Sequence, residues 1–400
     1  MKSIYFDLNI PKFLLTKALS PLWKGAYYSF ISPVSYSDLE DIALPGPKWV
    51  RIKNRLSGIC GSDLTLFFLK ANPKISAAAL PGMSRIFLGH EICGEVIEVG
   101  RDVSKIKTGQ RVVFQKIMPS CYDKEIEPRC CHCRAGNYTL CENQSEVNDV
   151  GDVGGGWSEM LVAHESQLLP IPEDISDDEA VLIEPAAVCM HAIMLRPPKP
   201  GDNILVVGAG IIGLLTLHIL KRMEPSCHVG IVARYDFQKD RAIKLGADHI
   251  MAGNDLYSEV AKLTNGKLFK GMFDNKMILG GFDKIFDCVG NGASIHDALR
   301  WCKAGGSVIL VGIDLNPSKF DYTPLALQET ELVGSFCHGM ENYNGEQMSS
   351  FELVIKFLKE NKLDFTGLIT HRYKLDDYKN ALTEISKKSE SGTIKAVFEH

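Results

Sequence analysis

Short apolar runs alternate with segments of helical periodicity between residues 200 and 337, and this is the most regular pattern in the chain. The first run, 203–207, leads into a glycine-rich turn and then into apolar positions at helical spacing over 214–220. Further apolar runs follow at 229–233, 282–290 and 306–312. This alternation predicts an α/β fold with a parallel, doubly wound sheet.

The residues before about 185 and after about 338 have a different pattern of apolar and polar positions. Small or apolar residues alternate with polar ones in the second half of 89–103, which predicts a strand ending in a glycine-bounded turn. Residues 176–179 have capping-box spacing and predict a helix that runs toward Glu184 and Pro185. The N-terminal part is therefore expected to be strand-rich and irregular, and the C-terminal part mixed.

Composition and charge narrow the class of protein. With 45% hydrophobic and 23% charged residues, the chain is expected to be soluble and globular. Its net charge of −5 gives no reason to expect nucleic acid or an anionic membrane as a partner. Apolar runs long enough for a membrane span and the features of a secretion signal are both missing, which favours a cytoplasmic location.

Cysteine usage points to metal. Twelve cysteines are too few for a disulfide scaffold, yet five of them lie between Cys121 and Cys141. Such crowding in a protein without a secretion signal favours metal ligation over disulfides.

The glycine-rich turn carries the first functional prediction. Its sequence is Gly208-Ala209-Gly210-Ile211-Ile212-Gly213, directly after an apolar strand and at the start of a helix. Glycines at this spacing permit a tight turn and a close approach of a pyrophosphate, which binds at the helix N-terminus. We therefore predict a Rossmann-type dinucleotide site.

The end of the second apolar strand should select between the two nicotinamide cofactors. A carboxylate there would accept hydrogen bonds from the ribose hydroxyls of NAD. The chain instead has Ala233, Arg234 and Tyr235, and an arginine suits a 2′-phosphate. We predict a preference for NADP over NAD, with the alternative that Asp236 binds the ribose.

Separate segments supply candidate ligands for a catalytic metal. Cys60 lies between two glycines, and His90 and Glu91 stand side by side at the entry of the predicted strand. Cysteine and histidine from different loops suit zinc, and either Glu91 or Glu184 could complete three protein ligands. The alternatives are that Cys60 is a small buried residue and that Glu184 merely ends a helix.

The cysteine-rich lobe, 119–142, resembles a second metal site. Cys130, Cys133 and Cys141 have Cys-x2-Cys-x7-Cys spacing and need a fourth ligand to close a structural zinc tetrahedron. Cys121 is the first candidate and Glu127 the second. The neighbouring Cys131 adds an ambiguity, and a reduced lobe without metal is the alternative.

Together these motifs resemble the zinc-containing medium-chain alcohol dehydrogenases, in particular the branch that acts on polyols such as sorbitol, on threonine and on related sugars or secondary alcohols. The resemblance covers the chain from about residue 45 onward. It implies a β-rich GroES-like catalytic domain plus a Rossmann domain. The expected boundaries are 1–187 for the first part of the catalytic domain, 188–337 for the Rossmann domain, and 338–400 for the return to the catalytic domain.

The resemblance also assigns roles. It implies that Cys60 and His90 hold the catalytic zinc, that Glu91 is the neighbouring carboxylate, and that Glu184 contacts the zinc or its water. It also implies that Ser62 belongs to a proton relay and that Asp63 supports His90. Two features depart from the family pattern. About 29 residues separate Cys60 from His90, which should reshape the substrate pocket, and Thr65 stands where the relay often has a histidine.

The resulting hypothesis is a zinc-dependent, NAD(P)-linked oxidation of a secondary alcohol or polyol to a ketone. The resemblance further implies a homo-oligomer, a dimer or tetramer. One alternative is a zinc-free NADPH-dependent quinone or enone reductase of the same fold. The other is a non-catalytic dinucleotide-binding protein.

Overall fold

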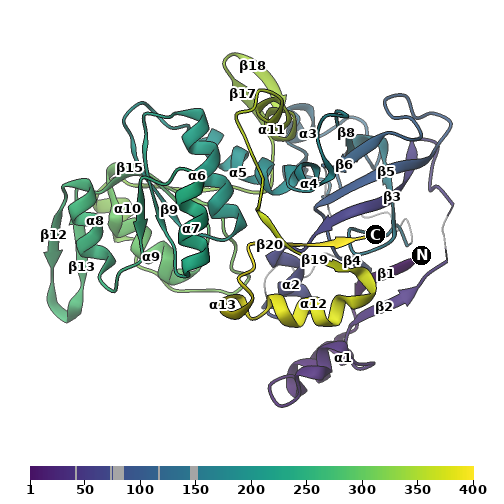
Figure 1. The fold of residues 1–400 in the computed structure, drawn as a ribbon, viewed down its shortest axis with the longest axis horizontal. Coiled ribbons are helices and arrows are strands. Elements are labelled where there is room, and N and C mark those ends of the chain that lie inside the picture. The colour runs from purple at the N-terminus through teal and green to yellow at the C-terminus, as the bar shows by residue number, and fades with distance from the viewer. Residues whose placement is uncertain (41–42, 73, 75–84, 116–117, 145–151) are drawn as a thin grey trace. The chain divides into compact units, whose positions relative to one another are not determined.

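The structure is a computed structural model of the 400-residue chain, and it describes all residues except 41–42, 73, 75–84, 116–117 and 145–151. The chain divides into two compact units. Unit 1 comprises Met1–Glu184 and Phe365–His400, and unit 2 comprises Pro185–Asp364. Both ends of the chain therefore contribute to unit 1, as the purple and yellow parts of the ribbon show in Figure 1.

Unit 1 is organised around a largely antiparallel sheet with the order β19-β20-β3-β5-β6-β8, in which β7 also pairs with β3. Strand β3 is central because every second residue from Val50 to Leu56 is buried, as a strand with one face on a core requires. A smaller sheet has the order β2-β1-β4. The described elements of unit 1 are β1 (Lys2–Asp7), α1 (Ile10–Leu19), β2 (Val34–Asp38), β3 (Trp49–Gly58), α2 (Gly61–Phe67), β4 (Arg85–Phe87), β5 (Ile92–Val99), β6 (Arg111–Phe114), α3 (Cys131–Arg134), β7 (Met160–His164), β8 (Leu168–Pro170), α4 (Asp177–Ala180), β19 (Ile369–Lys374), α12 (Tyr378–Ile385), α13 (Lys388–Ser391) and β20 (Lys395–Glu399).

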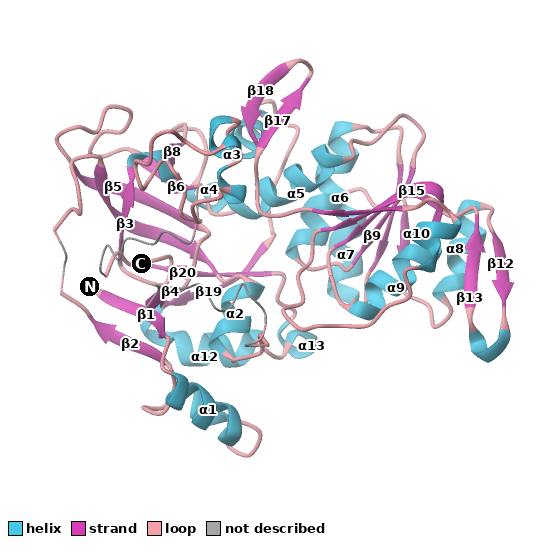
Figure 2. Cartoon of the chain, turned by 180° about the vertical axis from the view of Figure 1, so that it is seen from behind, coloured by secondary structure: helices cyan, strands magenta, loops and turns pink. Residues whose placement is uncertain are grey.

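Unit 2 contains a parallel sheet with the order β11-β10-β9-β14-β15-β16. The strand order reverses between β9 and β14, which is the switch point of a doubly wound sheet. Figure 2 shows these strands side by side with helices around them. The predicted fold class is confirmed. The described elements are α5 (Ile183–Leu195, which crosses the junction), β9 (Asn203–Val207), α6 (Ile211–Met223), β10 (His228–Val232), α7 (Asp236–Lys244), β11 (His249–Met251), α8 (Leu256–Thr264), β12 (Lys267–Lys270), β13 (Lys276–Leu279), β14 (Phe282–Asp287), α9 (Gly292–Trp301), β15 (Cys302–Leu310), α10 (Thr323–Leu327), β16 (Glu331–Gly334), β17 (Met340–Tyr343), β18 (Glu346–Ser349) and α11 (Ser350–Lys359).

The second junction lies at 364/365, whereas the sequence predicted a boundary at 337/338. The intervening hairpin β17–β18 and helix α11 belong to unit 2. Glu341 accepts a hydrogen bond from Ser350 (2.6 Å) and pairs with His191 of α5 (2.8 Å). The apolar face of α11 is buried as well, so these residues complete the α/β unit before the chain returns to unit 1.

The junction region also corrects a local prediction. The capping box at Ser176 is present, but its helix α4 ends at Ala180, and Glu184 lies in the first turn of the next helix, α5. The alternative that Glu184 merely ends a helix is therefore wrong. Proline suits this position because the first helical turn leaves its N–H groups without intrahelical partners. Among the described residues, every helix is too short or too polar to cross a membrane.

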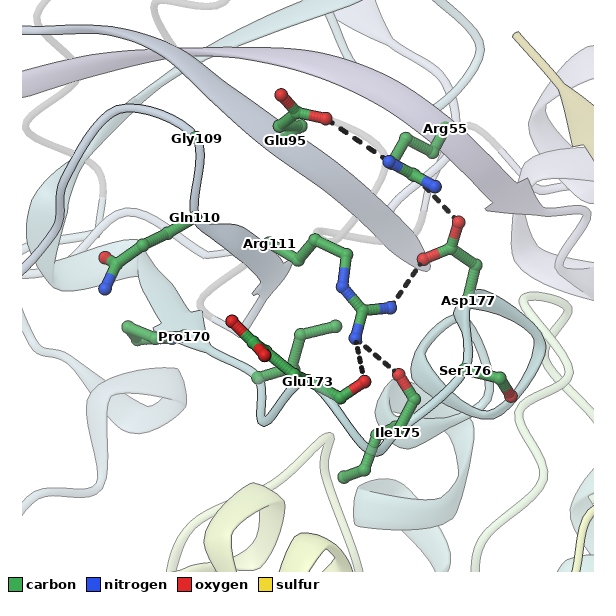
Figure 3. Close-up of a pocket in the computed structure, with 11 residues that line it drawn as sticks. Arg55, Glu95, Gly109, Gln110, Arg111, Pro170, Glu173, Ile175, Ser176 and Asp177 are labelled. Atoms are coloured by element: carbon green, nitrogen blue, oxygen red, sulfur yellow. Dashed lines mark hydrogen bonds and ion pairs between the residues drawn. The ribbon is translucent and has the colours of Figure 1, made fainter.

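A pocket of about 710 Å³ in unit 1 shows how the approach to α4 is held (Figure 3). Arg111, at the start of β6, donates to Asp177 (2.8 Å) and to the carbonyls of Pro172 (3.0 Å) and Ile175 (2.6 Å). Arg55 binds the other oxygen of Asp177 (2.7 Å). Both arginines therefore bind groups of the protein itself. Their hydrogen bonds fix the segment that leads to Glu184.

Replacing Arg111 with alanine is expected to destabilise unit 1 by about 2–4 kcal/mol, because one oxygen of Asp177 and the carbonyls of Pro172, Glu173 and Ile175 lose their shared donor. The midpoint of thermal unfolding should fall by roughly 5–10 °C. Arg55→Ala is the matched control, since this side chain is 44% exposed and its loss should cost under about 1 kcal/mol. Equal losses of stability in Arg111→Ala and Arg55→Ala would contradict the larger role given to Arg111.

The same ion pairs give a pH dependence. Burial would raise the pKa of the Asp177 carboxyl, but Arg111 and Arg55 outweigh burial and hold this pKa below its usual range. The contribution is therefore present above the unfolded carboxyl pKa of about 4, and it is lost as the pH falls through the lower folded value.

Candidate active site

Two loops of unit 1 bring three of the predicted metal ligands together. Cys60 caps the N-terminus of α2 just after β3, and His90 and Glu91 immediately precede β5. One ligand atom from each of these three residues lies within 4.8 Å of the other two. Gly89 permits this approach through its positive φ of 82°, and an added Cβ would lie 2.4 Å from Trp157.

Asp63 ties the two loops to each other. Its buried carboxylate accepts a hydrogen bond from the Gly89 amide (2.9 Å) and lies 3.5 Å from His90 Nδ1. Its other oxygen faces the Cys60 amide at 3.4 Å. Burial lowers the pKa of His90, but Asp63 and Cys60 outweigh burial and raise it well above its usual value. Asp63 thus orients the imidazole, as carboxylates do behind metal-bound histidines.

Glu91 is fixed by a residue that sequence reasoning missed. Its carboxylate is buried and forms an ion pair with Lys395 of β20, whose side chain is also buried. Gly58 makes room for it, because a Cβ at this position would lie 1.6 Å from Glu91 Oε2. The signal for Lys395 was a lysine next to the apolar run 396–398 of the closing strand, because a lysine is rarely buried unless it is paired.

Glu184 is buried and lies outside this three-residue cluster. Burial raises the pKa of its carboxyl to about 7, His90 opposes this effect, and Glu91 adds to it. Glu184 therefore lies near His90 and Glu91. Of the two glutamates, Glu91 is the one that shares the cluster with Cys60 and His90, and its role as the third ligand stays a prediction.

Ser62 and Thr65 follow Cys60 on α2. The Ser62 hydroxyl is exposed, and its Oγ lies 3.2 Å from Cys60 Sγ. Thr65 donates its hydroxyl to the Gly61 carbonyl (2.9 Å), one turn earlier in the same helix. Ser62 is thus placed beside the ligand cluster, while Thr65 is bonded to its own backbone.

The cysteine-rich lobe brings its four predicted cysteines into one cluster. Cys121, Cys130, Cys133 and Cys141 each place a sulfur within 4.8 Å of the others, and all four are free thiols. Cys141 Sγ lies 3.7 Å from Cys121 Sγ and 3.9 Å from Cys130 Sγ. A tetrahedral zinc with Zn–S bonds of about 2.3 Å holds its sulfurs about 3.8 Å apart, so the sulfurs fit that ion.

Backbone N–H groups also point at these sulfurs. The amides of Cys130, Cys133 and Asn143 donate to Cys121, Cys130 and Cys141 at 3.4–3.5 Å. Burial would raise the pKa of the Cys130 thiol, but the hydrogen bonds donated to it lower the pKa to about 6. Glu127, the other candidate for the fourth ligand, is exposed and pairs with Arg129 (3.0 Å).

The glycine-rich turn of unit 2 has the geometry of a phosphate site. Gly208 follows β9 with a φ of +96°, and Gly210 caps the N-terminus of α6. A Cβ at Gly213 would lie 1.8 Å from the Gly208 carbonyl oxygen, so the helix packs against the turn only with glycine there. Ile211 and Ile212 form the first turn of α6, whose N–H groups can bind an anion.

The turn after β10 contains the residues predicted to choose the cofactor. Ala233, Arg234 and Tyr235 lie between the end of β10 and the start of α7. The Arg234 guanidinium lies 5.6 Å from the centre of the Tyr235 ring. Asp236 is the first residue of α7, and its carboxylate is paired with Lys239 (2.8 Å).

Two family models match parts of the chain. Residues 46–173 match the family model described as alcohol dehydrogenase GroES-like domain, and residues 212–358 match the model described as zinc-binding dehydrogenase. The chain is 30% identical to L-idonate 5-dehydrogenase of Vitis vinifera, over 82% of this chain and 81% of the relative. It is 31% identical to sorbitol dehydrogenase of Arabidopsis thaliana, over 82% of both chains.

The chain belongs to the zinc-type medium-chain alcohol dehydrogenase family. Among solved structures, the 2R,3R-butanediol dehydrogenase of Bacillus subtilis resembles this member with a TM-score of 0.71 and 25% identity, covering 92% of this chain and 96% of that chain. The predicted family and the predicted enzyme class, an oxidoreductase, are confirmed.

In this medium-chain dehydrogenase, the extra length between Cys60 and His90 was expected to reshape the pocket. Residues 73 and 75–84 of that segment lie outside the described residues, so the expectation stays a prediction. The described start of the segment is helix α2, whose Phe67 packs at 6.4 Å from Trp157 and at 6.3 Å from Tyr378, measured between ring centres.

Proposed function

We propose that this enzyme oxidises a secondary alcohol or polyol to the corresponding ketone, using zinc held by Cys60, His90 and Glu91 and preferring NADP as the hydride acceptor. The observation that carries the proposal is the convergence of the three ligand atoms within 4.8 Å. The relatives named above are polyol-related dehydrogenases, which supports the substrate class.

The chemistry of the donor set suits zinc. One thiolate, one imidazole and one carboxylate leave the fourth position of a tetrahedron open for substrate or water. Lys395 neutralises part of the negative charge on Glu91, so two anionic ligands can share the cluster. A zinc ion bound there supplies a Lewis acid that lowers the pKa of a substrate hydroxyl.

The protein's own groups then handle the proton and the orientation. Ser62, 3.2 Å from Cys60 Sγ, is placed to accept the hydroxyl proton and to pass it to solvent, because its side chain is exposed. Asp63 holds the imidazole of His90 in place through the pair at 3.5 Å. A nicotinamide cofactor bound at the glycine-rich turn would supply the acceptor for the hydride of the carbinol carbon.

Arg234 supports the preference for NADP, because Asp236 is already paired with Lys239, while Arg234 lies beside the Tyr235 ring and forms no ion pair with a carboxylate among the described residues. Replacing Arg234 with alanine should lower kcat/KM for NADP roughly 10- to 100-fold and leave the value for NAD nearly unchanged. Steady-state kinetics with both cofactors measure this. A parent enzyme that strongly prefers NAD would contradict the proposal.

Metal content and a substrate panel test the proposed reaction. The dehydrogenase should contain about two zinc ions per chain, one for each cluster, and should oxidise members of a panel of polyols, sugars, secondary alcohols and threonine. A protein without zinc that reduces quinones or enones with NADPH would favour the reductase. A protein that binds dinucleotide but turns over none of these compounds would favour a non-catalytic role.

Compartment and assembly belong to the same proposal. All twelve cysteines are free thiols. The cysteines of the two candidate zinc clusters can bind metal only while they are reduced, which supports a cytoplasmic location. A dimer or tetramer is implied by the family, and sedimentation equilibrium would measure it.

A further inference from the structure

Helix α1 presents its apolar side to solvent. Ile10 is 71% exposed, Leu14 60% and Leu15 46%, and Leu19 is exposed too. With about 100° per residue, these four side chains and the exposed Pro11 and Ala18 fall within one half of the helix circumference. In a helix of an ordinary globular protein this half would face the core.

The opposite side of α1 is the one attached to unit 1. Thr16 is fully buried and donates its hydroxyl to the Ile31 carbonyl (2.8 Å), and Phe13 packs against the aromatic core of unit 1. The chain after the helix is anchored as well, since the Tyr28 and Thr383 hydroxyls lie 3.2 Å apart. The apolar half of α1 is thus held outward by the fold.

The turn that follows α1 extends the same surface. Leu22 is 91% exposed and Trp23 51%, and Phe30 lies exposed a little further along. Figures 1 and 2 both show α1 at the edge of unit 1, away from its central sheet. The whole segment precedes residue 46, where the match to the family model begins, and it contains none of the candidate site residues.

The charge of this segment differs in sign from that of the whole chain. Residues 8–37 contain Lys12, Lys17 and Lys24 and not one aspartate or glutamate, whereas the chain carries a net charge of −5. On the helix circumference Lys12 and Lys17 fall at the two borders of the apolar half. Lysines so placed can extend their ammonium groups sideways while their stems cover apolar surface.

We propose that α1 and the turn after it bind the surface of an anionic lipid bilayer, with the apolar half of the helix in the interface and the three lysines among the headgroups. An amphipathic helix with leucines on one face and lysines at its borders, followed by a turn with an exposed tryptophan, has the composition of an interfacial segment. Self-association through this face is disfavoured because two copies of α1 would bring six lysines together, with no carboxylate in either segment to pair them.

Vesicle flotation of the full-length enzyme tests the proposal. The enzyme should float with vesicles of phosphatidylcholine containing 30% phosphatidylglycerol, and much less with phosphatidylcholine alone. Lys12→Gln/Lys17→Gln/Lys24→Gln should weaken binding to the anionic vesicles roughly 100-fold. Leu14→Ser/Leu15→Ser/Leu22→Ser should weaken it at least about 10-fold while the dehydrogenase activity stays at the parental level.

The hairpin between β12 and β13 offers a matched control. Met272 and Phe273 are 81% and 99% exposed, yet they lie in unit 2, and Met272→Ser/Phe273→Ser should leave flotation unchanged. The proposal is overturned if the parent enzyme does not bind the anionic vesicles, or if the hairpin variant loses as much binding as the leucine variant. It is also overturned if the leucine variant lowers the oligomeric mass in sedimentation equilibrium, because α1 would then be an interface between copies.

Discussion

Replacing His90 with alanine is expected to reduce kcat for alcohol oxidation by roughly 1000-fold or more, and Cys60→Ser should have a similar effect. Each change removes one of the three ligands that, in the described part of the chain, converge within 4.8 Å. The Lewis acid that they hold is worth several kcal/mol at the transition state, and each ~1.4 kcal/mol is a factor of ten in rate. Steady-state kinetics together with zinc analysis of the purified variants measure the effect.

Dinucleotide binding is the internal control for these variants. The glycine-rich turn lies in unit 2, so fluorescence titration should give a nearly parental Kd for NADP. Glu184→Gln is the matched comparison, because Glu184 is buried near the cluster but outside it, and this variant should keep its zinc while Glu91→Gln loses it. Near-parental kcat in His90→Ala would exclude zinc catalysis, and the reverse pattern for the two glutamates would make Glu184 the third ligand.

The features that follow from neighbouring residues were predictable. Apolar runs alternating with helical segments were enough to predict the doubly wound sheet, because period and spacing are local properties of the chain. The turn at Gly208 was predictable for the same reason, since its strand, glycines and helix are contiguous. Cys60 and His90 were recognisable as candidate ligands from their flanking residues, and the structure brings them together, while their role as zinc ligands stays a prediction.

Features that depend on distant packing were not predictable. Lys395 reaches Glu91 across more than 300 residues of sequence, and Gly58 is needed only because the Glu91 carboxylate occupies the place of its side chain. The second junction was predicted at residue 338 because the pattern of apolar and polar residues changes there. The tertiary contacts of Glu341 keep the following segment in unit 2. The three lysines around α1 were likewise missed, because the net charge of the whole chain does not show where the charges lie.

Replacing Cys133 with serine is expected to unfold the cysteine-rich lobe locally and to remove about one of two zinc ions per chain. Cys133 is fully buried, and the lobe packs only a small apolar cluster around its sulfurs, so the metal rather than a core should hold residues 119–142 together. Structural zinc contributes about 10 kcal/mol or more to the folding of small isolated domains. The variant should therefore show faster hydrogen exchange in the lobe and a lower midpoint of thermal unfolding.

Cys131→Ser provides the matched control for that variant. Cys131 belongs to the same short helix α3, but its side chain is exposed and it lies outside the four-cysteine cluster. Its loss should leave the zinc content at about two per chain and the exchange rates unchanged, because the sulfurs of Cys121, Cys130, Cys133 and Cys141 already complete a tetrahedron. If Cys133→Ser kept both zinc ions, or if Cys131→Ser lost one, the fourth ligand would have to be assigned differently. A parent protein with one zinc per chain and a protected lobe would show that hydrogen bonds to the thiols hold the lobe without metal.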